Sequence, residues 1–352
     1  MIDTKKTYKS AILIPTMNRP DFVLRQLEFY KKTNCQHTIY IGDSSSEINR
    51  AKLVNNLDQY SESLNIKYFH WPNKNDREAV ADLGKEVEED YCALVGDDDF
   101  LIPSSITRCA EFLDSNLDYA TAQGKALLFS TKNDDLYAKI KDLSIYWDIK
   151  QLHDDSVARR VQNFSKKYWV NLFSIHRTKD FIVCSEKTRD LSERGLAEFL
   201  YCFYFIALGK SKYIDCLYLI RQMHSERGLS PLSPTFYGEE RLHSNEWRDS
   251  AEIFIETISS YISDTDKISS IKARKISKLC LQNVSQKKID KSWVFRMFIK
   301  IKSLIKRSDF LNTNIRLLIK SHDDLLKTFI DNPNVKDNFI FFEQFIQSKG
   351  KI

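Results

Sequence analysis

Short apolar runs alternate with amphipathic segments through the first hundred positions of the chain. Four of these runs have the length and composition of buried strands, and they are residues 11–15, 38–42, 66–71 and 91–95. The three segments between them place apolar residues at helical spacing on one face, and they are residues 21–32, 47–64 and 76–89. This alternation predicts an α/β fold with a mostly parallel sheet and helices on both of its faces.

Polar residues follow three of the four strands. The segment 16–19 follows the first strand, Asp43 follows the second, and the aspartates 97–99 follow the fourth. Because ligands of parallel sheets bind beyond the carboxyl ends of the strands, we expect these loops to meet at one binding edge. Three adjacent carboxylates repel one another unless a cation lies among them, and oxygen ligands favour Mg²⁺ or Mn²⁺ over zinc. For the aspartates alone, an acidic surface turn is the alternative.

The pattern changes beyond about residue 235. Before it, we expect a helix at 104–116, a strand at 119–130, an irregular polar segment at 131–167, a strand at 169–177, a helix at 191–208 and a strand at 212–220. After it, helices are expected at 241–263, 266–282, 292–306, 314–330 and 338–347. The chain is therefore predicted to consist of an α/β domain over 1–235 and an α-helical extension over 236–352.

Composition and charge exclude several classes of function. The net charge of +5 is small for 352 residues, so a nucleic-acid partner is not implied. The seven cysteines contain no Cys-x-x-Cys pair, which is typical of reduced thiols in a cytoplasmic protein. The first ten residues lack the apolar core of a signal peptide, and no apolar run approaches the ~20 residues that cross a bilayer. The sequence thus predicts a cytoplasmic location.

One segment of the extension leaves a membrane contact open. Residues 292–307 combine an apolar face with lysines and arginines around it. Such a helix either lies on the anionic inner face of the cell membrane or packs on the rest of the protein with its basic side chains in water.

The polar loops contain neither of the common glycine-rich phosphate motifs. There is no Gly-x-Gly-x-x-Gly and no Gly-Lys-Ser/Thr, so a bound nucleotide would need a metal and side chains to neutralise its phosphates. The triple aspartate fits that need. The three ordered motifs at the strand ends are Ile-Leu-Ile-Pro-Thr-Met-Asn-Arg (12–19), Ile-Gly-Asp-Ser-Ser (41–45) and Leu-Val-Gly-Asp-Asp-Asp-Phe-Leu-Ile-Pro (94–103). Together they resemble a family-two glycosyltransferase with the GT-A fold, over roughly residues 10–225.

This resemblance implies roles for the polar loops. The residues expected to bind the nucleotide are Pro15, Thr16, Arg19 and Asp43. The Asp-x-Asp-type motif of the family holds the ribose and a divalent metal, and its counterparts here are Asp97, Asp98 and Asp99. Alignment on Pro103 makes Asp98 the principal metal ligand, with Asp99 as a further one.

Two later segments receive roles by the same resemblance. The family's catalytic base lies eleven residues before a helix-ending glycine, which is Glu198 before Gly209. Glu193 is the second candidate for the base, and a structural role at the helix N-terminus is the alternative for Glu198. An Arg-x-x-His-like element follows the last core strand of relatives, so Arg221 is expected at the diphosphate and His224 at the metal.

The resemblance implies a metal-dependent, inverting glycosyltransferase of bacterial surface-glycan assembly. It would use Mn²⁺ or Mg²⁺ to move a sugar from a nucleotide-diphosphate sugar to a hydroxyl of a glycan or lipid-linked acceptor. Asp43 is compatible with reading uracil, which favours a UDP-sugar. The sequence departs from the family at three positions. Gly96 and Ala197 stand where acidic residues are common, and Asp82 stands where asparagine is common. The two missing acidic residues leave a catalytically degenerate GT-A partner as the alternative. A sugar nucleotidyltransferase is disfavoured, because its phosphate loop is missing.

Overall fold

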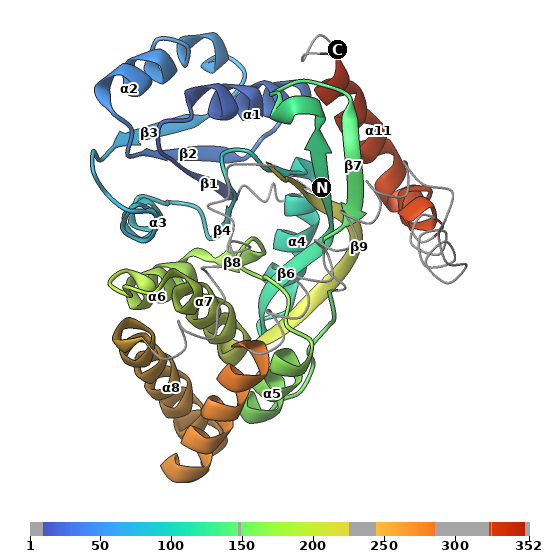
Figure 1. The fold of residues 1–352 in the computed structure, drawn as a ribbon. Helices are drawn as coiled ribbons and strands as arrows, with labels where there is room; N and C mark the ends of the chain where they lie inside the picture. Colours follow the sequence, from blue (N-terminus) through green and yellow to red (C-terminus); the bar gives the residue numbers. More distant parts are fainter. Residues whose placement is uncertain (1–9, 147–148, 225–243, 286–323, 325, 349–352) are drawn as a thin grey trace, which may run out of the picture.

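The computed structural model describes residues 10–146, 149–224, 244–285, 324 and 326–348. These residues contain a nine-stranded sheet flanked by helices (Figure 1). The strands are β1 (Ala11–Thr16), β2 (Thr38–Asp43), β3 (Ile66–His70), β4 (Tyr91–Leu94), β5 (Phe100–Leu101), β6 (Tyr119–Thr131), β7 (Ile140–Ile145), β8 (Ile175–Arg177) and β9 (Lys210–Gln222).

The helices alternate with the strands as far as β4 and then become more irregular in their spacing. They are α1 (Pro20–Lys32), α2 (Glu47–Val54), η1 (Asp58–Tyr60), α3 (Asp76–Lys85), α4 (Pro103–Ser115), η2 (Lys132–Asp134), α5 (Val157–Lys166), α6 (Thr178–Thr188), α7 (Arg194–Leu208), α8 (Asn245–Asp266) and α11 (Pro333–Gln347). Residues 270–285 and 326–330 are also helical.

The order of strands across the sheet is β3-β2-β1-β4-β8-β6-β9-β5, with β7 beside β6. From β3 to β4 all neighbours are parallel, and β6 also pairs with β9 in parallel. The strands β5, β7 and β8 add antiparallel pairs. Nearly every residue of β1, β2 and β4 is buried, which explains why their sequences are apolar runs and do not alternate. The predicted α/β class with a mostly parallel, helix-flanked sheet is confirmed.

Local sequence signals explain where several helices begin. Pro20 occupies the first turn of α1, where a missing N–H costs nothing. Asn75 and Glu78 form a capping box at the start of α3. Glu193 caps α7 by accepting the backbone N–H of Leu196 at 2.7 Å. Glu198 therefore lies in the second turn of that helix, and Glu193 occupies the N-terminal position that was the structural alternative for Glu198.

Some predicted elements have different bounds in the structure. The helix expected at 47–64 stops at Val54, and its later apolar residues reach the core through the short helix η1. Of the strand expected at 169–177, only Ile175–Arg177 pairs with neighbours. The segment 131–167, expected to be irregular, contains β7 and α5. These errors fall where tertiary packing overrides a short apolar run.

The described C-terminal helices pack at two separate places. Figure 1 shows α8 and the helix 270–285 beside α5 and α7, whereas α11 lies along β7 and β9 at the other end of the sheet. Phe342 and Phe345 of α11 pack on Phe29 of α1 and Phe100 of β5. The helix expected at 292–306 lies outside the described residues. Among the helices that the structure does describe, none is long and apolar enough to cross a bilayer.

Candidate active site

The loops after β1 and β2 are tied together at the carboxyl edge of the sheet. Asn18 adopts a left-handed conformation with φ of 58°, which turns the chain sharply between β1 and α1. Its N–H donates to Ser45 Oγ at 2.7 Å, and its side-chain oxygen accepts the N–H of Ser46 at 2.9 Å. This turn leaves Arg19 directly before Pro20, facing the loop that follows β4.

Two residues of the first loop bind two of the three aspartates. Thr16 Oγ1 donates to Asp97 Oδ2 at 2.8 Å. Arg19 bridges the pair, with Nη1 at 2.5 Å from Asp97 Oδ1 and Nη2 at 2.8 Å from Asp98 Oδ2. His224 joins them from beyond β9, with Nε2 at 2.9 Å from the same Asp98 oxygen. Residues far apart in the chain thus form one hydrogen-bonded group.

The third aspartate has a different environment. Asp99 is completely buried, and its Oδ2 accepts from Arg221 Nε at 2.7 Å. Its Oδ1 accepts the backbone N–H of Gln222 at 3.0 Å. Arg221 is held further by Tyr146, whose hydroxyl lies 2.5 Å from Nη1. Asp99 therefore fastens the acidic loop to the end of β9, and both of its oxygens are used for that purpose.

Two buried polar residues of α1 support the same loop from behind. Gln26 Nε2 donates to the carbonyl oxygens of Gly96 at 3.1 Å and Asp99 at 2.6 Å. Arg25 donates to the carbonyl oxygens of Asp98 at 2.9 Å and Leu136 at 2.8 Å. The sequence analysis missed both residues. Both are polar side chains on the inward face of an amphipathic helix. Such side chains are rarely buried unless they have hydrogen-bond partners, and this pattern was the signal in the sequence.

Burial and charge give the three carboxyl groups different affinities for a proton. Burial, with the neighbouring charge of Asp98, raises the pKa of Asp97 to about 7, although Arg19 and Thr16 oppose the rise. Burial also raises the pKa of Asp99 to about 6, although the positive charge of Arg221 lowers it. Burial acts in the same direction on Asp98, but His224 and Arg19 outweigh it and hold that pKa below its ordinary value. Asp98 is consequently the carboxylate best suited to bind a cation.

The donor atoms fit a divalent metal that is shared with a substrate. Asp98 Oδ2 and His224 Nε2 lie 2.9 Å apart, and both side chains are largely buried. Among the residues described by the structure, no group of three or more His, Cys, Asp or Glu side chains is arranged to hold a metal by itself. Mg²⁺ and Mn²⁺ sites of nucleotide enzymes commonly use one or two protein ligands and complete their coordination with phosphates and water. This donor set matches that pattern.

The remaining predicted nucleotide residues border the group without joining it. Asp43 is fully buried, and its carboxylate accepts from the Ser45 N–H at 2.8 Å and the Tyr68 hydroxyl at 2.7 Å. Pro15 lies one residue before the end of β1, opposite Gly42 in the parallel register. The Ser44 N–H donates to the Thr16 carbonyl at 2.9 Å, which places both loops at one edge.

The predicted base lies on another element. Glu198 of α7 accepts a hydrogen bond from the buried Tyr168 hydroxyl, with its Oε1 at 2.9 Å. Tyr168 precedes a turn that ends at Phe173, and the ring of Phe173 lies 4.5 Å from the guanidinium carbon of Arg221. The segment 168–173 thus runs from Glu198 to the residue that holds Asp99. Sequence reasoning missed Tyr168, because it was expected to precede a plain strand.

Two other polar residues have structural surroundings. His176 is buried against the ring of Phe205, with 3.6 Å between centroids, and burial lowers its pKa to about 3. These are the surroundings of a core residue. Asp82, where the family commonly has asparagine, accepts from Arg189 at 2.6 Å and also binds Lys74. It therefore joins α3 to the end of α6.

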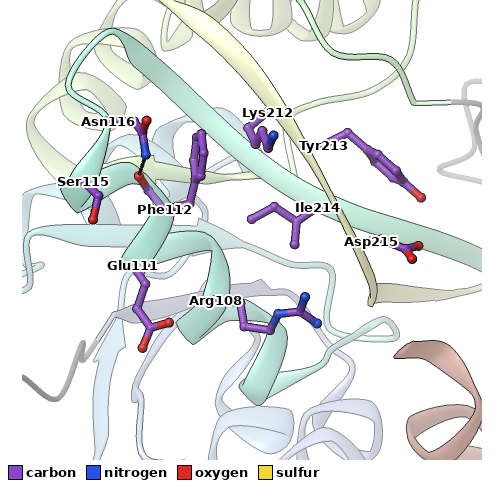
Figure 2. A pocket seen from close by; sticks show the side chains of 9 residues that line it. All are labelled: Arg108, Glu111, Phe112, Ser115, Asn116, Lys212, Tyr213, Ile214 and Asp215. Atoms are coloured by element: carbon purple, nitrogen blue, oxygen red, sulfur yellow. Dashed lines mark hydrogen bonds between the residues drawn. The ribbon is translucent and has the colours of Figure 1, made fainter. Parts of the chain in front are cut away.

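An open groove lies apart from this group, between α4 and β9 (Figure 2). Phe112 of α4 and Lys212 of β9 face it, and Lys212 Nζ lies 5.2 Å from the Phe112 ring centre. Asp215 at its end forms an ion pair with Lys125 at 2.5 Å. None of the site residues predicted from the sequence lines this groove.

The comparisons with known proteins include a matching family model. That model is described as Glycosyl transferase family 2, and it matches residues 11–177, slightly less than half of the chain. This part of the chain is therefore similar to family 2 glycosyltransferases. The matched range contains β1 to β8 and the three aspartates, and the sheet is GT-A-like. No curated protein matches the chain.

Several solved structures of S. aureus TarS are similar to the chain. TarS 1–349 in complex with UDP has 12% sequence identity and a TM-score of 0.48, covering 78% of this chain and 70% of that one. TarS 1–349 in complex with UDP-GlcNAc has 12% identity and a TM-score of 0.43, with coverages of 82% and 92%. A longer TarS structure has 13% identity and a TM-score of 0.41, and the match covers 72% of this chain but only 44% of TarS.

Proposed function

We propose that this protein is a metal-dependent, inverting glycosyltransferase. It transfers a sugar from a nucleotide-diphosphate sugar, with UDP-sugars favoured, to a hydroxyl of a glycan or lipid-linked acceptor. The observation that carries this proposal is the single hydrogen-bonded group formed by Thr16 and Arg19, the aspartates 97–99, Arg221 and His224. It lies at the carboxyl edge of the sheet, where α/β folds bind their ligands.

The donor's nucleotide would bind across the loops after β1 and β2. Pro15 and Thr16 would lie beside the nucleoside, and Asp43 is the residue assigned to the base. The Asp43 carboxylate is buried and already accepts from Tyr68 and the Ser45 N–H, so a uracil N–H would have to bind one of its remaining lone pairs. Asp97, anchored by Thr16, is the residue assigned to the ribose, and Arg221 lies beside the diphosphate.

Asp98 and His224 would hold the metal, and Asp99 would not. The two oxygens of Asp99 already bind Arg221 and Gln222, so Asp99 supports the loop instead of ligating. An imidazole ligand favours Mn²⁺ over Mg²⁺, because Mg²⁺ strongly prefers oxygen. When bound, the metal neutralises the negative charge that develops on the departing nucleotide diphosphate.

Glu198 would take the proton of the acceptor hydroxyl at its carboxylate. A hydroxyl is a weak nucleophile until a base removes its proton as the bond forms, which contributes ~10²–10⁴-fold in rate. The Tyr168 hydroxyl fixes Glu198 Oε1, so that the carboxylate does not rotate freely. One displacement at the anomeric carbon then gives inversion of configuration. Glu193 serves as the cap of α7, which leaves Glu198 as the base.

We propose that residues 1–235 carry the catalytic machinery and that residues 236–352 form the helical extension around it. A contact of residues 292–307 with an anionic membrane surface would bring the site close to a lipid-linked acceptor. This part of the proposal rests on the sequence pattern.

Isothermal titration of nucleotides tests the donor site directly. UDP and GDP are each titrated into the wild type with Mn²⁺ and with EDTA, and into Asp98→Ala and Asp154→Ala. Asp154 is the matched control, because its carboxylate accepts only from Asn163 beside α5, away from the acidic loop. We expect UDP to bind with Mn²⁺ and to lose most of its affinity in EDTA and in Asp98→Ala, while Asp154→Ala behaves as the wild type.

Two results would contradict the proposal. Absence of binding by either nucleotide at millimolar concentration would exclude the nucleotide-donor reading and favour a partner protein that keeps only the fold. Equal binding to the wild type and Asp98→Ala would exclude Asp98 as the metal ligand. Binding of GDP in place of UDP would change the donor class and leave the enzyme class intact.

A further inference from the structure

We infer that Arg19 is an internal counter-cation that makes metal binding depend on the nucleotide diphosphate. The inference rests on the proposed function and goes beyond it. It states that the protein binds the metal weakly when the metal is alone and tightly when the diphosphate is also present. The atom on which it depends is Asp98 Oδ2, which accepts from Arg19 and is also the proposed metal-binding oxygen.

The geometry gives Arg19 the place of a bridging cation. Its two terminal nitrogens lie 2.5 Å from Asp97 Oδ1 and 2.8 Å from Asp98 Oδ2, on separate carboxylates. Its Nη2 also lies 3.4 Å from His224 Nε2, the second proposed ligand atom. The ring of Phe22 lies 4.1 Å from the guanidinium carbon and packs edge-on against His224. A metal bound by Asp98 and His224 would therefore occupy the space of this guanidinium.

The charges of the group balance without a metal. Three carboxylates lie among three guanidinium groups. Arg19 and Arg221 bind the carboxylates of Asp97, Asp98 and Asp99, whereas Arg25 binds the backbone carbonyl of Asp98. Adding a divalent cation alone would leave an excess of two positive charges in a largely buried site. A nucleotide-diphosphate sugar brings about two negative charges, so the metal and the donor together restore neutrality.

Arg19 is suited to change partners when the diphosphate arrives. Its side chain retains 23% exposure, whereas Asp97 and Asp99 are nearly or fully buried. Guanidinium groups bind phosphate oxygens with paired hydrogen bonds as readily as they bind carboxylates. Movement of Arg19 onto the diphosphate frees Asp98 Oδ2 for the metal. Before the donor binds, Arg19 offsets the repulsion between the carboxylates of the acidic loop. After the donor binds, the same side chain contacts the diphosphate.

Direct metal titration distinguishes this role from simple support of the loop. Mn²⁺ alone, UDP alone and Mn²⁺ with saturating UDP are titrated into the wild type, Arg19→Gln, Arg19→Lys and Arg274→Gln, with free Mn²⁺ followed by electron paramagnetic resonance. Arg274 is the matched control, because it pairs with Glu252 of α8. Arg50 would not serve, because it lies beside Tyr68, the partner of Asp43. Circular dichroism and thermal unfolding verify that each variant is folded.

The inference predicts opposite shifts in one variant. In Arg19→Gln, Mn²⁺ alone binds about tenfold or more tightly than in the wild type, because one positive charge has left the site. In the same variant, UDP with Mn²⁺ binds about tenfold more weakly, because a phosphate contact is lost. Arg19→Lys keeps the charge and so continues to exclude Mn²⁺ alone. The Arg274→Gln variant matches the wild type in both titrations.

The outcomes separate this inference from the proposed function. If UDP binds the wild type with Mn²⁺ but Arg19→Gln takes up Mn²⁺ alone no more tightly, the counter-cation role is overturned and the donor site stands. If wild type and Arg19→Lys bind Mn²⁺ alone as tightly as with UDP, the inference is likewise overturned. If no nucleotide binds the wild type, the proposed function fails and the inference fails with it.

Discussion

At the scale of single residues, the site depends on polar side chains that are buried among apolar ones. Gln26 is fully buried on α1, yet it donates to two carbonyl oxygens of the acidic loop. Burial of an amide costs free energy unless the amide is hydrogen-bonded. Gln26 therefore stabilises the conformation of the acidic loop through these two bonds. Tyr168, which is also buried, donates its hydroxyl hydrogen bond to Glu198.

Gln26→Leu is expected to destabilise the fold and the acidic loop together. The substitution leaves the carbonyl oxygens of Gly96 and Asp99 without their donor, which costs about 1–3 kcal/mol in the free energy of unfolding. Urea denaturation measures the loss, and UDP titration should show a weaker affinity in the variant. Gln36→Leu, at an exposed position, is the control and should change stability by less than about 0.5 kcal/mol. A wild-type affinity for UDP in Gln26→Leu would contradict the positioning role.

Tyr168→Phe is expected to change the pH dependence of turnover. The hydroxyl donates to Glu198 and stabilises its charged form, so its removal raises the pKa of the base. The acidic limb of the kcat profile should therefore move to higher pH, while the KM for the donor stays within about twofold. Tyr204→Phe is the control. Tyr204 lies on α7, the helix that carries Glu198, and its ring packs against Tyr261. An unchanged profile in Tyr168→Phe would exclude Tyr168 as a positioning residue.

At the scale of elements, the last helix supports the loop that holds the acidic residues. Phe100 follows Asp99 directly, and its ring contacts Phe342 of α11 at 5.3 Å between centroids. Phe342 also contacts Phe129 of β6 at 5.0 Å. Aromatic pairs of this kind are worth about 0.5–1.5 kcal/mol beyond their buried area. The helical extension thus contacts, through Phe342, the residue that directly follows Asp99.

Phe342→Ala is expected to lower stability by about 3–5 kcal/mol, because it leaves a cavity between α11, β5 and β6. Metal-dependent UDP binding should weaken as well, since Phe100 loses its support next to Asp99. Ile340→Ala on the same helix is the control, because Ile340 is 38% exposed and should cost less than about 1 kcal/mol. A stability loss as small as the control's would show that α11 is not part of the core.

The sequence predicted the elements whose signal is local and missed those set by packing. The strand 11–15, the turn after it and the helix that begins at Pro20 follow from an apolar run, polar residues and a proline at a first turn. The bonds of Arg19 to Asp97 and Asp98 join residues almost eighty positions apart. The adjacent aspartates therefore predicted a neighbouring cation, but the sequence did not show that the guanidinium of Arg19 is such a cation. Asp99 was expected at a metal, and only the structure placed Arg221 and Gln222 against it.

At the scale of the whole molecule, burial of neutral histidine makes the fold sensitive to acid. His176 is buried in β8 against Phe205, and burial lowers its pKa from 6.5 to about 3. The unfolded chain binds a proton at this residue below about pH 6.5, whereas the folded protein does not. The resulting stabilisation is complete above pH 6.5 and is lost as the pH falls toward 3.

His176→Leu should therefore flatten the dependence of stability on pH. Between pH 7 and pH 5, His176 contributes about 2 kcal/mol to the fall in the free energy of unfolding. Denaturant unfolding of the wild type and the variant at both pH values gives the difference in slope, which removes the contributions of all other titrating groups. The comparison holds even if the variant is less stable at pH 7. Equal slopes would contradict a neutral, buried His176.

The central claim is that the chain transfers sugars from a nucleotide donor with Glu198 as the base. The most direct measurement is the release of UDP from a panel of UDP-sugars, followed by mass spectrometry with Mn²⁺ or EDTA, in the wild type and in Glu198→Gln. We predict Mn²⁺-dependent release by the wild type from at least one donor, and release slower by ~10²–10⁴-fold in Glu198→Gln with unchanged affinity for UDP. Tight binding of UDP without release from any sugar donor would contradict the account and leave a binding protein built on the glycosyltransferase fold.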